Sequence, residues 1–286
     1  LADAAMLSRM MVPEMERKGY NRAFAAAITA GGSLVTPIIP PGIALIIYGL
    51  VADVSIGKMF IAGLVPGLLC AVVLMFTVYL VARKTNAKPS RESWPTGKEV
   101  VFSLGQAWPA LFLIFAVVGG IRANIFTPTE AGAVAVLIVL AIGFFIYREM
   151  RISHVVKALG ETARATASVM LVIMASAALG WIFSMEHAGV AVANFVTSLT
   201  ENKYMFLLII NILLLTLGMF LEGNAILLIL VPLLKPVVEH FGIDPVHFGI
   251  IMIFNLSIGA FTPPVGTVML LVCNITQVSV GNFFKQ

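Results

Sequence analysis

Long stretches of the chain carry almost no charge, and this feature constrains the fold more than any other. Residues 63–82 form an apolar run without Asp, Glu, Lys or Arg, which ends at Arg83. A helix of about 20 apolar residues crosses the roughly 30 Å hydrocarbon core of a bilayer. Hydrophobic residues make up 60% of the 286 residues and charged residues only 11%, whereas a soluble domain carries about 25% charged residues. Because backbone polar groups must be satisfied inside lipid, the chain is expected to be an all-α, polytopic membrane protein.

The charged and reactive residues exclude several classes of function. The net charge of +4 comes with basic residues in short loops and no basic stripe among aromatics, so nucleic-acid binding is not expected. Cys70 and Cys273 lie inside apolar runs, where a buried thiol is expected rather than a disulfide or metal ligand. The sequence lacks His-Glu-x-x-His, Gly-x-Ser-x-Gly and a phosphate-binding glycine loop, so neither an enzyme nor a cofactor is expected. Both ends, Leu1 and Gln286, look like cuts in a longer chain.

The apolar runs divide the chain into an ordered set of segments. The segments expected to be helical are 1–16, 21–50, 63–82, 107–126, 129–147, 161–185, 203–220, 224–240 and 246–275. Residues 51–62 are expected to form an interfacial connector, 83–99 a polar loop and 186–202 an amphipathic connector.

Basic residues give these segments an orientation. Three connections are rich in Lys and Arg, namely 17–22, 83–98 and 148–157. They alternate with connections that are poor in basic residues, and the positive-inside rule therefore puts the rich connections in the cytoplasm. Residues 21–50 then run outward and residues 246–275 run inward.

Two of the apolar segments are interrupted by prolines at matching places, in T-P-I-I-P-P-G (36–42) and in T-P-P-V-G (262–266). Proline removes a helical hydrogen bond, and the freed carbonyls must be buried in protein or line a watered cavity. Such carbonyls, with a Thr hydroxyl, suit a small hard cation such as sodium, and the half-helix beyond each break presents free N–H groups to an anion. An ordinary proline kink is the alternative. Paired breaks in oppositely oriented segments favour an inverted-topology repeat, as in many secondary transporters.

The segment 203–240 is expected to be a re-entrant hairpin. Its two apolar arms meet at Glu-Gly-Asn (222–224), and both outer ends are polar. A carboxylate or amide at membrane depth is costly and points to function. The alternative is two full spans with this junction in the opposite aqueous layer. By the repeat, Ala-Asp-Ala-Ala (2–5) follows the tip of a matching first hairpin, whose incoming arm would lie before Leu1.

Two shorter motifs are expected to serve structure. Thr127-Pro128-Thr129-Glu130 is typical of an N-terminal helix cap, and we favour this interpretation over a substrate contact. Gly63 and Gly67 form a Gly-x-x-x-Gly pattern that permits close helix packing, although the pattern is frequent by chance.

A series of longer motifs runs along the whole chain in the order of one transporter family. These motifs are A-D-A-A (2–5), P-E-M-E-R-K-G-Y (13–20), R-A-F-A-A-A-I-T-A (22–30), P-I-I-P-P-G (37–42), Y-G-L-V-A-D-V-S-I-G (48–57), F-T-P-T-E-A-G-A (126–133), G-M-F-L-E-G-N-A (218–225), G-I-D-P-V-H-F-G (242–249) and T-P-P-V-G (262–266). The chain resembles the large membrane (M) subunit of TRAP transporters, the tripartite ATP-independent periplasmic family. Among these it is most similar to the sialic acid systems.

The resemblance implies an elevator-type transporter fold in the bacterial inner membrane, with re-entrant hairpins and two discontinuous helices. Residues 1–62 and 186–286 would form the transport domain, and residues 63–185, with the cytoplasmic loop 83–99, the scaffold. The implied partners are a small membrane (Q) subunit or its fused equivalent, a periplasmic substrate-binding protein, an organic anion, sodium ions and the lipid bilayer.

The resemblance also implies two sodium sites and one substrate contact. The residues expected around sodium are Gly32, Ser33, Thr36 and Pro41 for the first ion, and Gly223, Asn224, Thr262 and Pro263 for the second. Asp3 is the candidate for substrate contact. Two features depart from the family pattern. The Gly/Ser-rich tip of the first hairpin is absent from this chain, and many relatives have Asp-Gly-Thr where this chain has Glu222-Gly223-Asn224.

The sequence therefore predicts sodium-coupled uptake of an organic anion, with sialic acid preferred over a C4-dicarboxylate. An ion channel or ion pump subunit is the alternative from a different class, followed by a membrane-embedded enzyme and a passive assembly subunit. A channel conducts ions without substrate, whereas a coupled transporter takes up its substrate in a sodium-dependent manner.

Overall fold

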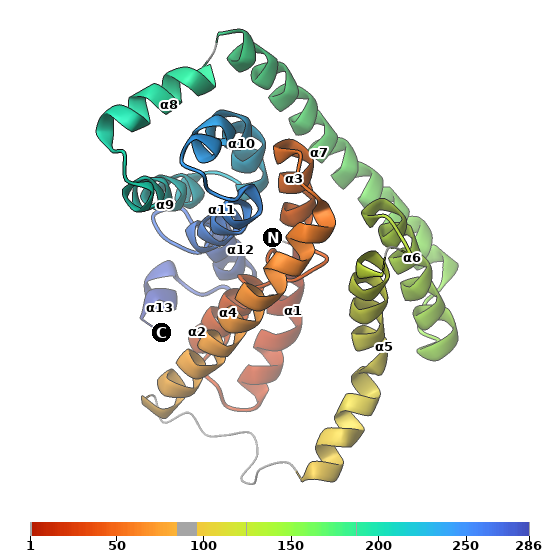
Figure 1. Ribbon diagram of the computed structural model, residues 1–286. Coiled ribbons are helices and arrows are strands. Elements are labelled where there is room, and N and C mark those ends of the chain that lie inside the picture. The colour runs from red at the N-terminus through yellow and green to blue at the C-terminus, as the bar shows by residue number, and fades with distance from the viewer. Residues whose placement is uncertain (1, 85–95, 124, 187, 286) are drawn as a thin grey trace. The chain divides into compact units, whose positions relative to one another are not determined.

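The computed structural model describes residues 2–84, 96–123, 125–186 and 188–285, and the regular elements in this part of the chain are all helical (Figure 1). The helices are α1 (Ala2–Arg17), α2 (Arg22–Ser33), α3 (Ile43–Ala52), α4 (Ile56–Lys84), α5 (Gly97–Arg122), α6 (Pro128–Ala141), α7 (Ile152–Met185), α8 (Ala188–Leu199), α9 (Lys203–Phe220), α10 (Gly223–His240), α11 (Pro245–Gly259), α12 (Thr267–Thr276) and α13 (Val280–Phe284), with a π-helical turn, Ile142–Ile146, after α6. Residues 85–95 of the expected cytoplasmic loop 83–99 lie outside the described residues.

Within the described residues, six helical stretches are long and apolar enough to cross a membrane. They are Ile56–Lys84, Gly97–Arg122, Pro128–Ile146, Ile152–Phe183, Lys203–Phe220 and Gly223–His240. The predicted all-α, polytopic membrane class is therefore confirmed, and the chain is a multi-pass membrane protein.

The helices form two compact units, one of residues 1–92 and 182–286 and one of residues 93–181. In the second unit α5 packs on α6, which begins with the predicted cap. Thr127 N donates to Glu130 Oε2 (2.7 Å), and Glu130 N donates to Thr127 Oγ1 (3.3 Å). This reciprocal capping box confirms that the motif begins a helix. The predicted division into transport and scaffold domains concerns relative motion and stays a prediction.

The first unit contains two segments with the same order of elements. One runs α1, α2, a non-helical break and α3; the other runs α10, α11, a break and α12 (Figure 1). Each turn between the first two helices has a glycine with positive φ, Gly19 (86°) or Gly242 (62°). A side-chain cap follows two residues later, at Asn21 or Asp244. The breaks each contain a cis X-Pro bond, Pro40-Pro41 and Pro263-Pro264.

The two segments also end alike, at a residue with left-handed backbone: Asp53 (φ 56°) after α3 and Gln277 (φ 54°) after α12. The predicted interruption of both long apolar segments is therefore confirmed. The opposite orientation of the two segments in the membrane stays a prediction.

The connector at residues 51–62 differs from expectation, and α5 and α7 begin earlier than expected, at Gly97 and Ile152 rather than at 107 and 161. Residues 51–62 were expected to link two helices, but only residues 53–55 are non-helical and α4 starts at Ile56. Asp53 ends α3 in the left-handed conformation, and Val54 N donates to Gly49 O (2.9 Å), which closes the helix. Ser55 then accepts from Met59 N through its carbonyl (3.0 Å). One tight turn both ends and restarts the helix, so the predicted connector is wrong in its extent.

Helix α4 lies close to the first break because two of its residues are glycines. A Cβ at Gly63 would collide with the carbonyl oxygen of Ile38, and a Cβ at Gly67 would lie 2.6 Å from Ile39 Cγ1. Both glycines are buried. The Gly-x-x-x-Gly pattern therefore does permit close packing here, and α4 packs against the first break.

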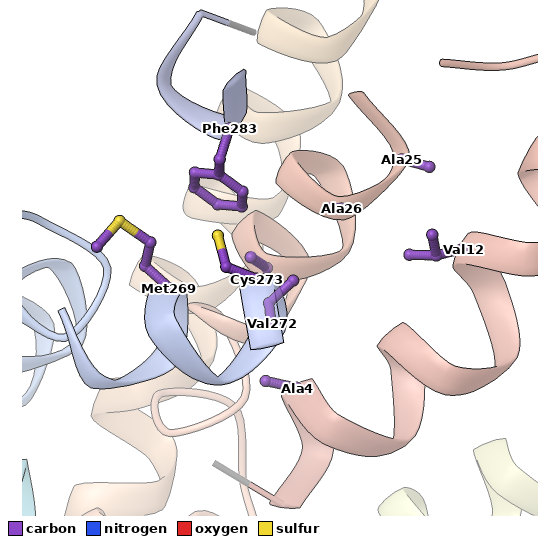
Figure 2. Close-up of a cluster of buried hydrophobic side chains, with 9 residues drawn as sticks. Ala4, Val12, Ala25, Ala26, Met269, Val272, Cys273 and Phe283 are labelled. Atoms are coloured by element: carbon purple, nitrogen blue, oxygen red, sulfur yellow. The ribbon is translucent and has the colours of Figure 1, made fainter. Parts of the chain in front are cut away.

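The two segments exchange their last helices. Helix α12 packs on α1 and α2, while α3 packs on α10 and α11. Figure 2 shows the first of these contacts, where Val272 and Cys273 of α12 meet Ala4 and Ala26 of the first segment. The small alanines let the helices approach closely, and Phe283 of α13 covers the cluster.

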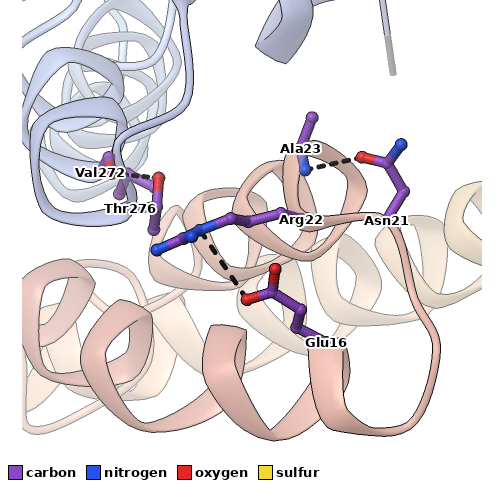
Figure 3. Close-up of polar contacts among 6 residues, drawn as sticks. All are labelled: Glu16, Asn21, Arg22, Ala23, Val272 and Thr276. Atoms are coloured by element: carbon purple, nitrogen blue, oxygen red, sulfur yellow. Dashed lines mark hydrogen bonds and ion pairs between the residues drawn. The ribbon is translucent and has the colours of Figure 1, made fainter.

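The turn that orients α1 against α2 is fixed by polar contacts (Figure 3). Asn21 Oδ1 accepts from Ala23 N (2.8 Å), which caps α2, and Arg22 Nε lies 3.9 Å from Glu16 Oε2. The ion pair is half-exposed, so the side-chain cap contributes more to the turn, about 1 kcal/mol.

Candidate functional site

The exchange of helices brings the two breaks and the junction between α9 and α10 to one cavity in the first unit. The cavity has a volume of about 140 Å³ and is lined by both breaks, the start of α10 and parts of α1, α2, α3, α11 and α12. Residues about 220 positions apart in the sequence, such as Asp3 and Asn224, therefore line the same cavity.

Five of the nine predicted site residues line this cavity. They are Asp3, Ser33, Thr36, Gly223 and Asn224. They come from both predicted sodium sets and from the predicted substrate contact, so residues of all three predicted groups meet at one cavity.

The other four predicted residues do not line the cavity. Gly32 borders a separate apolar cavity beside α4. Pro41 and Pro263 lie in the breaks and are exposed. Thr262 is partly buried, and its hydroxyl donates to Ile258 O (2.7 Å), a carbonyl of α11. Binding of sodium at either set stays a prediction.

Two polar residues of the cavity lining were not singled out from the sequence, Ser257 in α11 and Thr267 at the start of α12. Ser257 stands one turn before the second break and Thr267 directly after it, so proximity to a proline break is the signal that could have found them. Ser257 Oγ donates to Ile253 O (2.7 Å), as Ser33 Oγ donates to Ala30 O (2.7 Å). Each hydroxyl has used its proton, and its lone pairs remain free to accept a hydrogen bond or bind a cation.

The tip of the α9–α10 pair is organised by Glu222. Its Oε2 accepts from Ala225 N (3.0 Å), which caps α10, and its Oε1 accepts from Asn224 Nδ2 (2.7 Å). Both Glu222 and Asn224 line the cavity. The carboxylate is thus held at the cavity wall by two hydrogen bonds, beside the positive end of the α10 dipole.

A side-chain hydrogen bond, a close crossing of glycines and a backbone hydrogen bond join helix α9 to α11 and to the second break. Asn255 Nδ2 donates to Asn211 Oδ1 (2.5 Å). The backbones of the two helices cross at Gly218 and Gly259 without room for a side chain between them. The second break adds Gly266 N, which donates to the carbonyl of Met219 (2.9 Å). Lone amides in apolar runs are the sequence signal for this contact, since such residues hydrogen-bond across helices in membranes.

The cavity wall is acidic. Asp3 and Glu222 both line it, and among the described residues no Lys, Arg or His does so. Its remaining polar side chains are one amide and four hydroxyls, Asn224 with Ser33, Thr36, Ser257 and Thr267. Such oxygen-rich surroundings suit a hard cation and a ligand with hydroxyl groups.

Comparison with known proteins gives a consistent result along the whole chain. The family described as "Tripartite ATP-independent periplasmic transporter, DctM component" matches residues 1–286. The chain is 39% identical over 282 residues to "Sialic acid TRAP transporter large permease protein SiaM" of Vibrio cholerae, covering 97% of this chain and 65% of that protein. It is 38% identical over 284 residues to "C4-dicarboxylate TRAP transporter large permease protein DctM" of Pseudomonas aeruginosa, covering 98% of this chain and 65% of the relative.

A third relative is longer. The chain is 36% identical over 284 residues to "Isethionate TRAP transporter permease protein DctMQ" of Oleidesulfovibrio alaskensis, covering 99% of this chain and 45% of that protein. The chain thus spans 65% of the length of the first two relatives and less of the third.

Proposed function

Because the chain belongs to the DctM component family of tripartite ATP-independent periplasmic transporters, we propose that it carries out sodium-coupled secondary uptake of an organic anion across the bacterial inner membrane. The chain is a transporter permease and not an enzyme. Sodium acts in this proposal as the coupling ion, not as a cofactor.

The observation that carries the proposal is the convergence of both breaks and the hairpin tip on one cavity. A break in a membrane helix leaves carbonyl and N–H groups without helical partners. Such groups occur at membrane depth only where they are buried in protein or line a watered cavity, and there they can bind a ligand. Discontinuous helices meeting near one point are the usual construction of ion and substrate sites in secondary transporters. An ordinary kink in each helix would require no such meeting point.

The same geometry supports the coupling of ion and anion. Ser33 and Ser257 keep lone pairs for a cation, and the wall also bears the carboxylates of Asp3 and Glu222. An anion that enters the cavity without a cation is repelled by these carboxylates. The cation and the anion therefore each stabilise the binding of the other. Reciprocal stabilisation of this kind is the physical basis of symport.

We assign the movement to an elevator mechanism. The shared element order of the two segments and the exchange of α3 and α12 support an inverted-topology repeat that moves as one body. In this mechanism α9 and α10 form a re-entrant hairpin, and the tip at Glu222-Gly223-Asn224 reaches the cavity from one side of the membrane.

The names of the relatives guide the choice of substrate and partners. SiaM is named for sialic acid, DctM for C4-dicarboxylates and DctMQ for isethionate. The proposed substrate is sialic acid, with a C4-dicarboxylate as second choice. The proposed partners are a periplasmic substrate-binding protein and a small membrane subunit, either separate or fused.

Uptake by the full-length permease in proteoliposomes, reconstituted with its small subunit, tests the proposal. Radiolabelled sialic acid and a panel of other carboxylic acids are offered with and without a sodium gradient and purified binding protein. We expect accumulation of one acid only when both sodium and binding protein are present. Ion currents without any acid would instead identify a channel, and uptake independent of sodium would reject the coupling.

A further inference from the structure

We propose that Glu222 makes the cavity selective for singly charged, hydroxyl-rich carboxylic acids over dicarboxylic acids. The inference rests on the proposed function, since it concerns the acid that this cavity binds. It identifies the tip carboxylate as a specificity-determining residue.

The first argument is the charge of the cavity wall. A carboxylate of the substrate enters a cavity of about 140 Å³ that Asp3 and Glu222 line and that no described Lys, Arg or His lines. Two bound sodium ions, one for each predicted set, balance the two wall carboxylates, so a second substrate carboxylate adds repulsion that no side chain of the wall compensates. Both wall carboxylates are exposed, so water screens this repulsion, which is strongest for a substrate carboxylate that lies directly beside Glu222.

The second argument is that the charge of Glu222 is fixed in place. Ala225 N and Asn224 Nδ2 hold its two oxygens at 3.0 and 2.7 Å, and Asn224 itself lines the cavity. A carboxylate held by two hydrogen bonds cannot turn away when an anion arrives without uncapping α10. The end of the α10 dipole offsets only part of a charge, about half.

The third argument concerns hydrogen bonding. The hydroxyls of Ser33 and Ser257 donate to carbonyls of their own helices, Ala30 O and Ile253 O, and therefore act as acceptors toward the cavity. The two wall carboxylates are also acceptors. A second carboxylate on the substrate brings only acceptors to this wall, whereas hydroxyl groups bring donors. These acceptors thus complement the hydroxyl groups of a polyhydroxylated acid, whereas a second carboxylate finds no such match.

Two pairs of acids isolate the effect of one charge. Succinamate and succinate differ by one amide-to-carboxylate change, and gluconate and glucarate differ by one hydroxymethyl-to-carboxylate change. Each acid competes at saturating sodium for binding of the transported acid to the full-length permease with its small subunit. In the wild-type protein we expect the singly charged member of at least one pair to be about tenfold more potent than its dianionic partner, which corresponds to about 1.4 kcal/mol.

Two substitutions at one position separate charge from capping. Glu222→Asn removes the charge and keeps a side-chain oxygen that caps α10, whereas Glu222→Asp keeps both. We expect Glu222→Asn to reduce the tenfold preference to about twofold or less and Glu222→Asp to retain it. Glu201→Asn, on the exposed connection before α9 and outside the cavity lining, controls for general surface charge and is expected to retain the preference.

Several results would overturn the inference. A wild-type protein that binds the dianion of each pair as well as or better than its partner contradicts it without any variant. An unchanged preference in Glu222→Asn contradicts the inference, and so does a loss of preference in Glu201→Asn equal to that in Glu222→Asn. The proposed function stands in either case as long as sodium-dependent uptake remains intact. If no carboxylic acid binds, the proposed function fails together with the inference.

Discussion

The crossing of α9 and α11 at Gly218 and Gly259 leaves no space for a side chain, and this makes Gly259→Ala a sharp perturbation. A Cβ on Gly259 would lie 2.7 Å from Gly218 Cα and 3.0 Å from Leu215 O. Both are backbone atoms and cannot rotate away, whereas ordinary contact begins at 3.4 Å. The two helices must therefore separate locally by about 0.7 Å.

This separation has a cost that the structure lets us estimate. Overpacking of a tight contact costs about 1–3 kcal/mol. The hydrogen bond from Gly266 N to Met219 O, now 2.9 Å, lengthens as α9 retreats, and its loss costs about 1 kcal/mol. We expect Gly259→Ala to lose about 2–4 kcal/mol of stability, the sum of these two costs. The apparent sodium affinity should fall as well, because Gly266 and Met219 flank the second break and the hairpin tip.

Thermal unfolding of the full-length protein in detergent, followed by uptake measurements, checks this estimate. Gly218→Ala is a milder variant, since its Cβ would lie 3.2 Å from Gly259 Cα, and Gly281→Ala in α13 has nothing within 4 Å. We expect the unfolding temperature to fall in the order Gly281→Ala, Gly218→Ala, Gly259→Ala. If Gly259→Ala unfolds at the same temperature as Gly281→Ala, the reasoning is refuted.

Three further substitutions test separate parts of the account. Thr262→Ala is expected to lower the apparent sodium affinity of uptake several-fold in reconstituted vesicles, and unchanged sodium dependence would reject the second sodium set. Asp3→Ala is expected to abolish most uptake with little change in unfolding temperature; wild-type uptake would remove Asp3 from the site. Tyr48→Phe removes the hydroxyl that donates to Pro245 O (2.6 Å) and is expected to cost about 1 kcal/mol of stability. An unfolding temperature equal to that of the wild type would show that this bond between α3 and α11 contributes nothing.

Much of the fold follows from local sequence signals. The breaks between α2 and α3 and between α11 and α12 fall at the two proline-rich motifs because proline cannot continue a helix. The start of α6 at Pro128 follows from the capping residues Thr127 and Glu130. The start of α10 next to Glu222 follows the same logic, since an acidic residue directly before a helix caps it.

The composition of the cavity could not be predicted from local sequence patterns, because it depends on how distant helices pack. Ser257 and Thr267 join Asp3 at one wall only because α3 and α12 exchange between the two segments. Thr262 carries the Thr-Pro signature, yet its hydroxyl bonds to Ile258 O of α11. The close crossing at Gly259 likewise depends on which helix lies opposite, and a single glycine in an apolar run does not specify its partner.

In the proposed mechanism, one cavity couples the movement of a cation to that of an organic anion. Simultaneous measurement of ²²Na⁺ and ¹⁴C-labelled acid influx into proteoliposomes, with purified binding protein and the acid identified by the uptake panel, tests it most directly. We expect that neither label enters alone, that both enter in a fixed ratio, and that Gly259→Ala lowers both rates together. Sodium influx without acid, or acid influx that persists without sodium, would contradict it.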